Sequence, residues 1–218
     1  MSSSATATLS PRAKVDLSSI DQRVFLHDVP WEEYERLLEV RGESSVPRMT
    51  YLEGELELMT PSHHHEGIKT RLARLLETWG EEAGVELYGV GSWTIKQRRE
   101  ERGAEADECY LIDPDPSLDP ADDDAWPRRP DLAIEVVWTS GGIPKLEVWR
   151  KLGVPEVWIW QADRLTLHAL RGERYQEIPA SELLPDLDLE LLLRFLETPP
   201  GQTAAVRAYR AALKAAAK

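Results

Sequence analysis

The sequence is poor in cysteine, has no long apolar run and carries few basic residues for its number of acids. A single cysteine, Cys109, excludes an internal disulfide framework and is typical of the reducing cytoplasm. It lies in an expected strand, so we interpret it as a buried core residue and not as a nucleophile. No apolar stretch approaches the roughly 20 residues of a membrane-spanning helix, and the Ser- and Thr-rich start lacks a hydrophobic signal region. We therefore expect a cytoplasmic protein without a membrane partner.

Basic residues are scarce relative to acidic ones. The sequence has 26 Lys and Arg residues against 39 Asp and Glu residues, and its formal net charge is -13 at pH 7. Nucleic acid favours a basic surface, because its phosphates are negatively charged. The composition therefore excludes a general affinity for nucleic acid, and any such binding must depend on a local basic patch.

The length of 218 residues allows one substantial core with extended ends. Residues 1–24 are rich in Ser, Thr and Ala and then mixed, without sustained periodicity, which predicts a mobile N-terminal arm. Residues 25–198 contain the periodic segments and form the expected domain. Residues 199–218 are Ala-rich after two prolines and a glycine, and they predict a C-terminal helix that packs either on the body of the domain or on a partner.

Local patterns predict the order of helices and strands along the domain. Apolar residues at helical spacing predict helices, and short apolar or β-branched runs bounded by Gly predict strands and hairpins. The expected elements are a helix at 30–38, a hairpin at 49–59, a helix from Ser62 to Gly80 or Gly84, strands at 85–90, 93–98 and 106–112, a hairpin at 164–178 and a leucine-rich helical region at 181–196.

The stretch from residue 130 to residue 160 organises the rest of the chain. Residues 130–138 are apolar and β-branched, as in a strand inside a sheet. A flexible Ser-Gly-Gly turn leads to a helical pattern with one apolar face at 145–151, which Gly153 ends. Residues 156–160 predict a second buried strand. A strand, a helix and a strand within about 30 residues predict a parallel crossover, and hence an α/β (mixed α+β) fold.

Glu135 lies in the middle of the first strand of this unit, among apolar residues. Burying an unpaired carboxylate costs several kcal/mol, so a cation, a metal ion or the open end of a cleft must compensate it. For an acid on its own, an ion pair with an arginine is at least as good an explanation as a functional site.

Other acids could complete a site with Glu135. Asp131 faces the same side of the strand, but at about 3.3 Å per residue it lies roughly 13 Å away, too far to share one ion. We interpret it as a structural acid at the mouth of the strand. Asp107, at the start of the preceding strand, is the best candidate for a second ligand. Two carboxylates from adjacent strands are a common way to hold Mg²⁺ or Mn²⁺ for phosphate chemistry. Lys145, at the start of the helix, could then orient an attacking water and stabilise developing charge.

Two further clusters resemble metal sites without satisfying their requirements. Residues 113–129 are rich in Asp and Pro, but they lack the ligand spacing and the closing Glu of a calcium loop, and we expect a solvated loop. The run His63-His64-His65 has no cysteine or second histidine cluster to complete a zinc site. We predict a loop leading into a helix, with His65 able to reach the cleft.

Taken together, these segments resemble the Uma-type restriction endonucleases, a branch of the PD-(D/E)XK nuclease superfamily. The hairpin at 51–59 and His65 match the upstream pattern of this branch, so the resemblance spans about residues 25–196. The main matching segments are Glu105-Ala106-Asp107, Pro130 to Val136, Ser140-Gly141-Gly142, Lys145-Leu146-Glu147 and Gly153 to Trp158.

The resemblance implies a restriction-endonuclease-like central mixed β-sheet flanked by helices, and metal-dependent cleavage of DNA. It implies that Asp107 and Glu135 bind the metal ion and that Lys145 is the catalytic lysine, with Glu55 and His65 in supporting positions.

Two positions depart from the superfamily pattern. The lysine expected two residues after the glutamate is Val137 here, so Lys145 would have to replace it from the helix. The proline of the first motif is Ala106, a milder change that leaves the aspartate in place.

The sequence therefore predicts an endonuclease that hydrolyses DNA phosphodiester bonds with Mg²⁺ or Mn²⁺. Two alternatives remain open: a catalytically inactive binding module that keeps the nuclease fold, which the acidic charge favours, and a hydrolase of small phosphate esters. Because duplex cleavage needs two active sites, we also expect a homodimer, for which the C-terminal helix could supply the interface.

Overall fold

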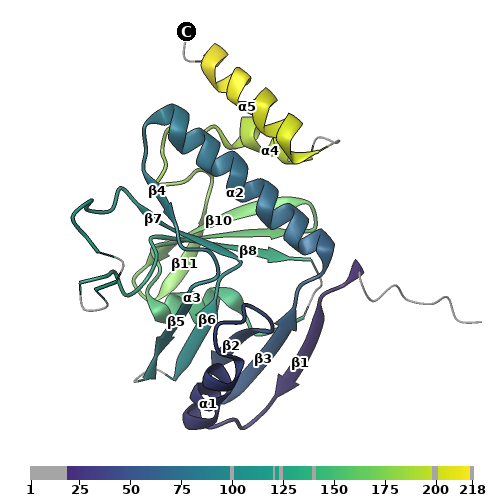
Figure 1. The fold of residues 1–218 in the computed structure, drawn as a ribbon, viewed down its shortest axis with the longest axis vertical. Coiled ribbons are helices and arrows are strands. Elements are labelled where there is room, and N and C mark those ends of the chain that lie inside the picture. The colour runs from purple at the N-terminus through teal and green to yellow at the C-terminus, as the bar shows by residue number, and fades with distance from the viewer. Residues whose placement is uncertain are drawn as a thin grey trace, which may run out of the picture.

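The structure is a computed structural model that describes residues 19–98, 101–119, 121–122, 125–138, 141–197 and 201–216. Helices and strands alternate along the chain (Figure 1). The strands are β1 (Gln22–Leu26), β2 (Arg48–Leu52), β3 (Glu55–Thr60), β4 (Leu87–Gly89), β5 (Thr94–Gln97), β6 (Arg102–Glu105), β7 (Glu108–Ile112), β8 (Leu132–Val137), β9 (Glu156–Gln161), β10 (Arg164–Arg171) and β11 (Arg174–Ile178). The helices are α1 (Trp31–Arg41), α2 (His63–Ala83), α3 (Lys145–Leu152), α4 (Leu189–Glu197) and α5 (Gln202–Ala216).

The strands form two sheets. One has the order β1-β3-β2-β6-β5 and is antiparallel, and the other has the order β11-β10-β9-β8-β7-β4. In the second sheet β8 and β9 are parallel and the remaining neighbours are antiparallel. The predicted mixed fold and the parallel crossover at residues 130–160 are therefore confirmed. Within the described residues, none of the helices combines the length and the apolar character that crossing a membrane requires.

Helices cover both faces of the six-stranded sheet. In Figure 1 the long helix α2 runs across this sheet, with α4 and α5 on its outer side, while α1 lies against the five-stranded sheet. Leu132, Ile134 and Val136 of β8 pack in the cluster that includes α2, and Ala133, between them, packs in the cluster that includes α3. Because side chains alternate along a strand, Glu135 points to the same face as Ala133, toward α3.

The three histidines expected in a loop belong to a helix. The prediction of a loop at His63-His64-His65 is wrong, since α2 begins at His63. The side chain of Ser62 accepts a hydrogen bond from the backbone N–H of His65 at 3.3 Å, and Glu66 lies in the first turn, where the helix dipole favours an acid. This cap fixes the direction in which His65 points.

The boundaries of two predicted segments differ from those in the structure. The expected strand at 106–112 is the shorter β7, and Asp107 lies in the two-residue link from β6, which the sequence pattern did not predict. The predicted end of the N-terminal arm, at residue 24, falls inside β1, whose residues 22–26 pair with residues 56–60 of β3. Because β6 belongs to the five-stranded sheet and β7 to the six-stranded sheet, the link that contains Asp107 carries the chain from one sheet to the other.

Cys109 is buried in β7, and its thiol donates a hydrogen bond to the backbone oxygen of Gly91 at 3.1 Å. Burial raises the pKa of the Cys109 thiol to about 12. Because the thiolate is the reactive form, we expect a thiol reagent to label the native protein at least a hundredfold more slowly than the urea-unfolded protein, on the order set by such a pKa. Native labelling as fast as labelling in urea would contradict this interpretation of Cys109.

Candidate active site

Asp107 and Glu135 face the same side of the six-stranded sheet. Glu108 of β7 pairs with Ile134 of β8, and continuing this antiparallel register by one residue sets Asp107 opposite Glu135. Directly opposite residues share a face of the sheet. The backbone N–H of Val136 also donates to Asp107 Oδ2 at 2.5 Å, and both acids are 1% exposed. Two carboxylates from adjacent strands therefore lie side by side in the protein interior.

Lys145 reaches Glu135 from the first residue of α3. Its Nζ lies 3.5 Å from Glu135 Oε2 and donates a hydrogen bond to Thr50 Oγ1 at 3.0 Å. Trp149, one turn further along α3, donates from Nε1 to the other oxygen of Glu135 at 2.7 Å. The helix thus holds the glutamate with two side chains on one face. The compensation required for this buried acid comes from a lysine and not from an arginine.

Asp107 is held by Arg48 and His65. Arg48 of β2 donates from Nη1 to Asp107 Oδ1, and His65 Nε2 lies 2.9 Å from the same oxygen. The other ring nitrogen of His65 lies 3.2 Å from Asp21 Oδ2. Burial favours the neutral form of Asp21, but hydrogen bonds from His65 and the backbone N–H of Ser62 outweigh it, and the pKa of Asp21 lies below its usual value. Asp21, His65 and Asp107 therefore form a buried chain in which the histidine lies between the two acids.

Glu57 is a further buried acid at this place, and the sequence did not reveal it. It lies on β3 directly opposite Thr50 of β2, the residue that accepts from Lys145. Its Oε2 accepts from the backbone N–H of Ile143 at 2.8 Å, and its Oε1 lies 3.0 Å from Arg23 Nε. A Cβ atom on Gly142, whose φ is +125°, would meet Glu57 Oε2 at 2.7 Å. The loop before α3 therefore needs glycine at this position.

A cavity of about 310 Å³ opens beside this cluster. Its polar wall comes from β1, β3, β9 and the start of α3, and its apolar wall comes from β8, β9 and the loop before α3. The lining residues are Arg23, Glu57, Val137, Gly141, Gly142, Ile143, Pro144, Lys145, Leu146, Ile159 and Gln161. Lys145 thus lies between the buried acids and a space that a substrate could enter.

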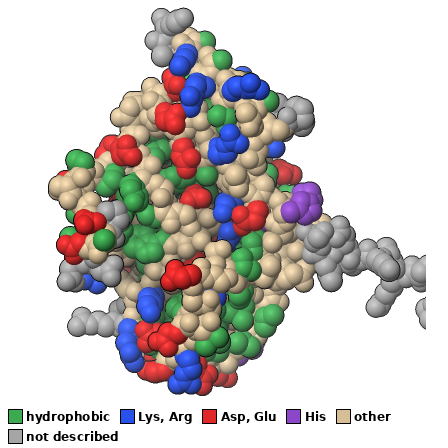
Figure 2. Space-filling view, viewed as in Figure 1, with side chains coloured by type: hydrophobic (Ala, Val, Ile, Leu, Met, Phe, Trp, Pro, Cys, Tyr) green, Lys and Arg blue, Asp and Glu red, His purple; other side chains and the backbone are tan. Residues whose placement is uncertain are grey.

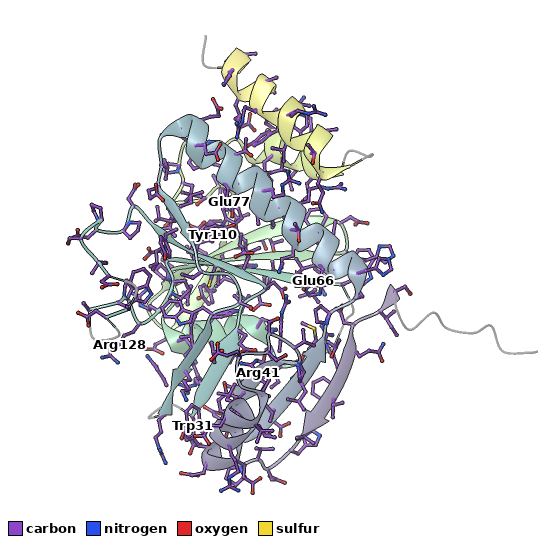
Figure 3. The ribbon with its side chains drawn as sticks, in the orientation of Figure 1. Trp31, Arg41, Glu66, Glu77, Tyr110 and Arg128 are labelled. Carbon is purple, nitrogen blue, oxygen red and sulfur yellow. The ribbon has the colours of Figure 1, made fainter. Side chains whose placement is uncertain are left out.

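Four buried acids where the two sheets meet each have a cation of their own. A buried carboxylate needs such a cation or several hydrogen-bond donors to be stable. Figure 3 shows Glu66 at the start of α2 and Arg41 beside α1. Glu66 is a second partner of Arg48. The pairs are Arg23–Glu57, Arg41–Glu105, Arg48–Asp107 and Lys145–Glu135.

Two predicted residues lie apart from the cluster. Asp131 accepts a hydrogen bond from the backbone N–H of Ile112 at 3.0 Å, which fits a structural acid at the mouth of the strand. Glu55, the first residue of β3, is half exposed and pairs with His27 at 2.5 Å. Neither contact connects these acids to Glu135.

The donor set is suited to a hard divalent cation. Carboxylate oxygens are the protein ligands that Mg²⁺ and Mn²⁺ prefer, and these ions usually keep several waters or substrate oxygens. Among the described residues, no three His, Cys, Asp or Glu side chains gather to form a metal site. Asp107 and Glu135 are two donors of this kind, and a site built on them would need its other ligands from backbone, water or phosphate oxygens.

Known proteins resemble this chain in sequence family and in fold. A family model described as Uma2, Putative restriction endonuclease, matches residues 31–201. Among solved structures, the crystal structure of a putative nuclease belonging to DUF820 from Anabaena variabilis ATCC 29413 matches with a TM-score of 0.50. Its sequence identity is 15%, and the match covers 77% of this chain and 99% of that chain. At this identity the likeness shows the fold alone. No curated protein matches the chain.

Proposed function

Because this chain belongs to the Uma2 family, described as putative restriction endonucleases, we propose that it is a metal-dependent endonuclease of the PD-(D/E)XK type that hydrolyses DNA. The observation that carries the proposal is the approach of Lys145 to Glu135, at 3.5 Å, beside the neighbouring Asp107. This arrangement supplies two hard ligands and a cation next to a cavity, as phosphodiester hydrolysis requires.

Asp107 and Glu135 are the residues that would hold Mg²⁺ or Mn²⁺. When bound, such an ion lowers the pKa of a coordinated water and neutralises charge on the scissile phosphate. Lys145 lines the cavity, and Thr50 fixes its ammonium group. There it can orient the attacking water and stabilise negative charge that grows on the phosphate oxygens. Trp149 keeps the Glu135 carboxylate in one orientation by donating to its inner oxygen.

The DNA must approach a locally basic part of this acidic molecule. In Figure 2 basic side chains are most frequent toward the top of the view, where α5 lies, and acids and bases mix over the rest of this face. Helix α5 carries Arg207, Arg210 and Lys214. It packs on α2, where Arg210 and Lys214 already pair with Glu81 and Glu82, near the end of α2 opposite to His65. We propose that duplex DNA approaches the side of the molecule on which Lys145 lines the cavity.

A plasmid assay tests the proposed activity. Supercoiled plasmid incubated with the protein and Mg²⁺ or Mn²⁺ is expected to be nicked or linearised, and excess EDTA is expected to stop the reaction completely. Removal of the ion removes both the activated water and the charge on the phosphate. Circular dichroism with and without EDTA would show that the fold persists. Cleavage that continues unchanged in EDTA would refute a metal-dependent mechanism.

A binding module without activity is the second candidate. The specific observation in its favour is that the four buried acids already have cations, so the protein can be stable without a metal ion. Intact plasmid at every ion tested, together with saturable DNA binding by the same protein sample, would favour this candidate over an endonuclease.

Cutting both strands of a duplex requires two active sites, and we propose a homodimer on this ground. Ala205 and Tyr209 of α5 are buried, and α5 packs on α2 and α4 of its own chain. An interface that uses α5 would therefore involve its outer face. Light scattering after gel filtration would measure the molar mass directly.

The free, buried Cys109 is compatible with the cytoplasm, where we propose that the protein acts.

A further inference from the structure

Arg48 already occupies the acid that the metal ion would need. Its guanidinium is buried, with 6% of the side chain exposed, and it donates from Nη1 to Asp107 Oδ1. From Nη2 it donates to Glu66 Oε1 at 2.6 Å. One side chain of β2 thus joins the link between the two sheets to the first turn of α2. The positive charge of the Arg48 guanidinium therefore lies beside Asp107 Oδ1, where a bound divalent cation would also have to lie.

The two candidate ligands differ in how much of their carboxylate is free. Asp107 accepts from Arg48 at Oδ1, with His65 Nε2 2.9 Å from that oxygen, and from the backbone N–H of Val136 at Oδ2. Glu135 accepts from Trp149 at Oε1, whereas its Oε2 lies 3.5 Å from Lys145. Among the described residues no hydrogen-bond donor engages Glu135 Oε2. An ion that approached Glu135 would meet only the ion pair with Lys145 at Oε2, whereas it could meet Asp107 only by displacing a hydrogen-bonded partner.

Displacement of Arg48 is feasible because its second partner lies toward solvent. The Glu66 side chain is 37% exposed, and Lys69 also pairs with it at 3.0 Å. A guanidinium that leaves Asp107 can keep its bond to Glu66 at the start of α2. In a site of low polarity, two cations at one carboxylate oxygen repel each other strongly, so the guanidinium and the ion exclude one another there.

On the premise of the metal-dependent function proposed above, we propose that Arg48 is a positioning residue that competes with the divalent cation for Asp107. It holds Asp107 in place when no ion is bound and turns toward Glu66 when an ion binds. The apparent affinity for the ion is then lower than two carboxylates would give, because only the fraction of molecules with Arg48 displaced can bind it. Arg48 therefore sets the ion concentration that the protein needs.

Isothermal titration with Mn²⁺ tests this proposal in the full-length protein. Arg48→Gln, which removes the charge, is expected to bind Mn²⁺ at least about tenfold more tightly than the wild type, within the usual range of coupling between two sites. Arg102→Gln is the matched control. It also removes a buried arginine, one that pairs with Glu53 at 3.1 Å, and is expected to leave the Mn²⁺ affinity unchanged. In cleavage assays the Mg²⁺ concentration for half-maximal rate should fall in Arg48→Gln by the same factor.

Thermal unfolding with and without Mn²⁺ covers the case in which the variant folds poorly. Arg48→Gln removes the cation from Asp107 and leaves His65 and the backbone N–H of Val136 as its partners, so it should melt at a lower temperature than the wild type without the ion and regain more stability with it. A variant that remains unfolded even with Mn²⁺ would overturn the proposal, because the ion should replace the missing charge.

The titration also separates the two proposals. Equal Mn²⁺ affinities for the wild type and Arg48→Gln, both abolished by Asp107→Asn, would overturn the competition and leave the metal-dependent function standing. An absence of Mn²⁺ binding in both proteins would overturn the metal site together with the role of Arg48.

Discussion

Replacing Lys145 with methionine is expected to slow DNA cleavage by about a hundredfold to a thousandfold, the usual effect of removing one group that stabilises charge in a transition state. Methionine keeps most of the length and volume of the side chain but removes the ammonium that lies 3.5 Å from Glu135 and donates to Thr50. The protein should still bind DNA, since that binding depends on the wider surface. Single-turnover cleavage rates with saturating Mg²⁺ would measure the loss.

Lys151 supplies a matched control on the same helix. It pairs with Glu53 and lies 3.6 Å from Glu147, away from the buried acids. Lys151→Met should therefore cleave DNA within about threefold of the wild-type rate, because the carboxylates that Lys151 pairs with lie near the surface and outside the candidate site. If Lys145→Met retained the rate of Lys151→Met, Lys145 would have no part in the chemistry.

Replacing Arg41 with methionine is expected to lower the free energy of unfolding by about 3–5 kcal/mol, the typical result of removing one partner of a buried ion pair. Glu105 is 3% exposed, and Arg41 is its charge partner. The backbone N–H of Met49 and the hydroxyl of Thr94 also donate to Glu105, at 2.9 and 2.5 Å, but neither neutralises it. Urea denaturation followed by circular dichroism would give the free energies of the two proteins.

The double variant Arg41→Met/Glu105→Gln isolates the interaction between the pair. Removing the buried charge together with its partner should recover a large part of the lost stability. An exposed pair offers a further comparison, since Arg164 and Glu177 are 71% and 56% exposed, and Arg164→Met should change the stability by less than about 1 kcal/mol. Equal losses in Arg41→Met and Arg164→Met would show that burial does not determine the strength of these pairs.

The sequence was sufficient to predict the crossover of β8, α3 and β9 and the residues that surround Glu135. Two buried strands and a capped helix leave strong local patterns, and an acid in an apolar run stands out against them. Lys145 could be inferred because the helix start is fixed by the Gly-Gly turn and the proline before it. These predictions depend on residues close together in the chain.

The parts that the sequence did not predict depend on distant packing. Glu57 alternates with Leu56 and Leu58, a pattern typical of a solvent-facing acid, but the hairpin is covered on both sides and Glu57 is buried. Strand β6 was missed because Gly103 and Ala104 are weak strand formers. A Cβ atom at Gly103 would collide with the ring of Tyr34 in α1, so helix packing requires a glycine that no local pattern explains.

The same reasoning applies to Arg48, which comes just before a predicted hairpin and has no local feature of a buried residue. Its partners Glu66 and Asp107 lie 18 and 59 residues away in the chain. Asp21, in the stretch predicted as an arm, is 5% exposed because Ser62 and His65 bind its carboxylate. Only the folded arrangement of the two sheets brings these charges together.

The link at Asp107 makes the candidate site sensitive to the alignment of β7 against β8. Successive residues of a strand point to opposite faces, so sliding β7 by a single position would turn this carboxylate from the α3 side into the apolar layer beneath α2. An insertion or deletion of one residue in this strand should therefore eliminate the site even if every acid and base were still present. The candidate site therefore depends on the number of residues in β7 as much as on which residues they are.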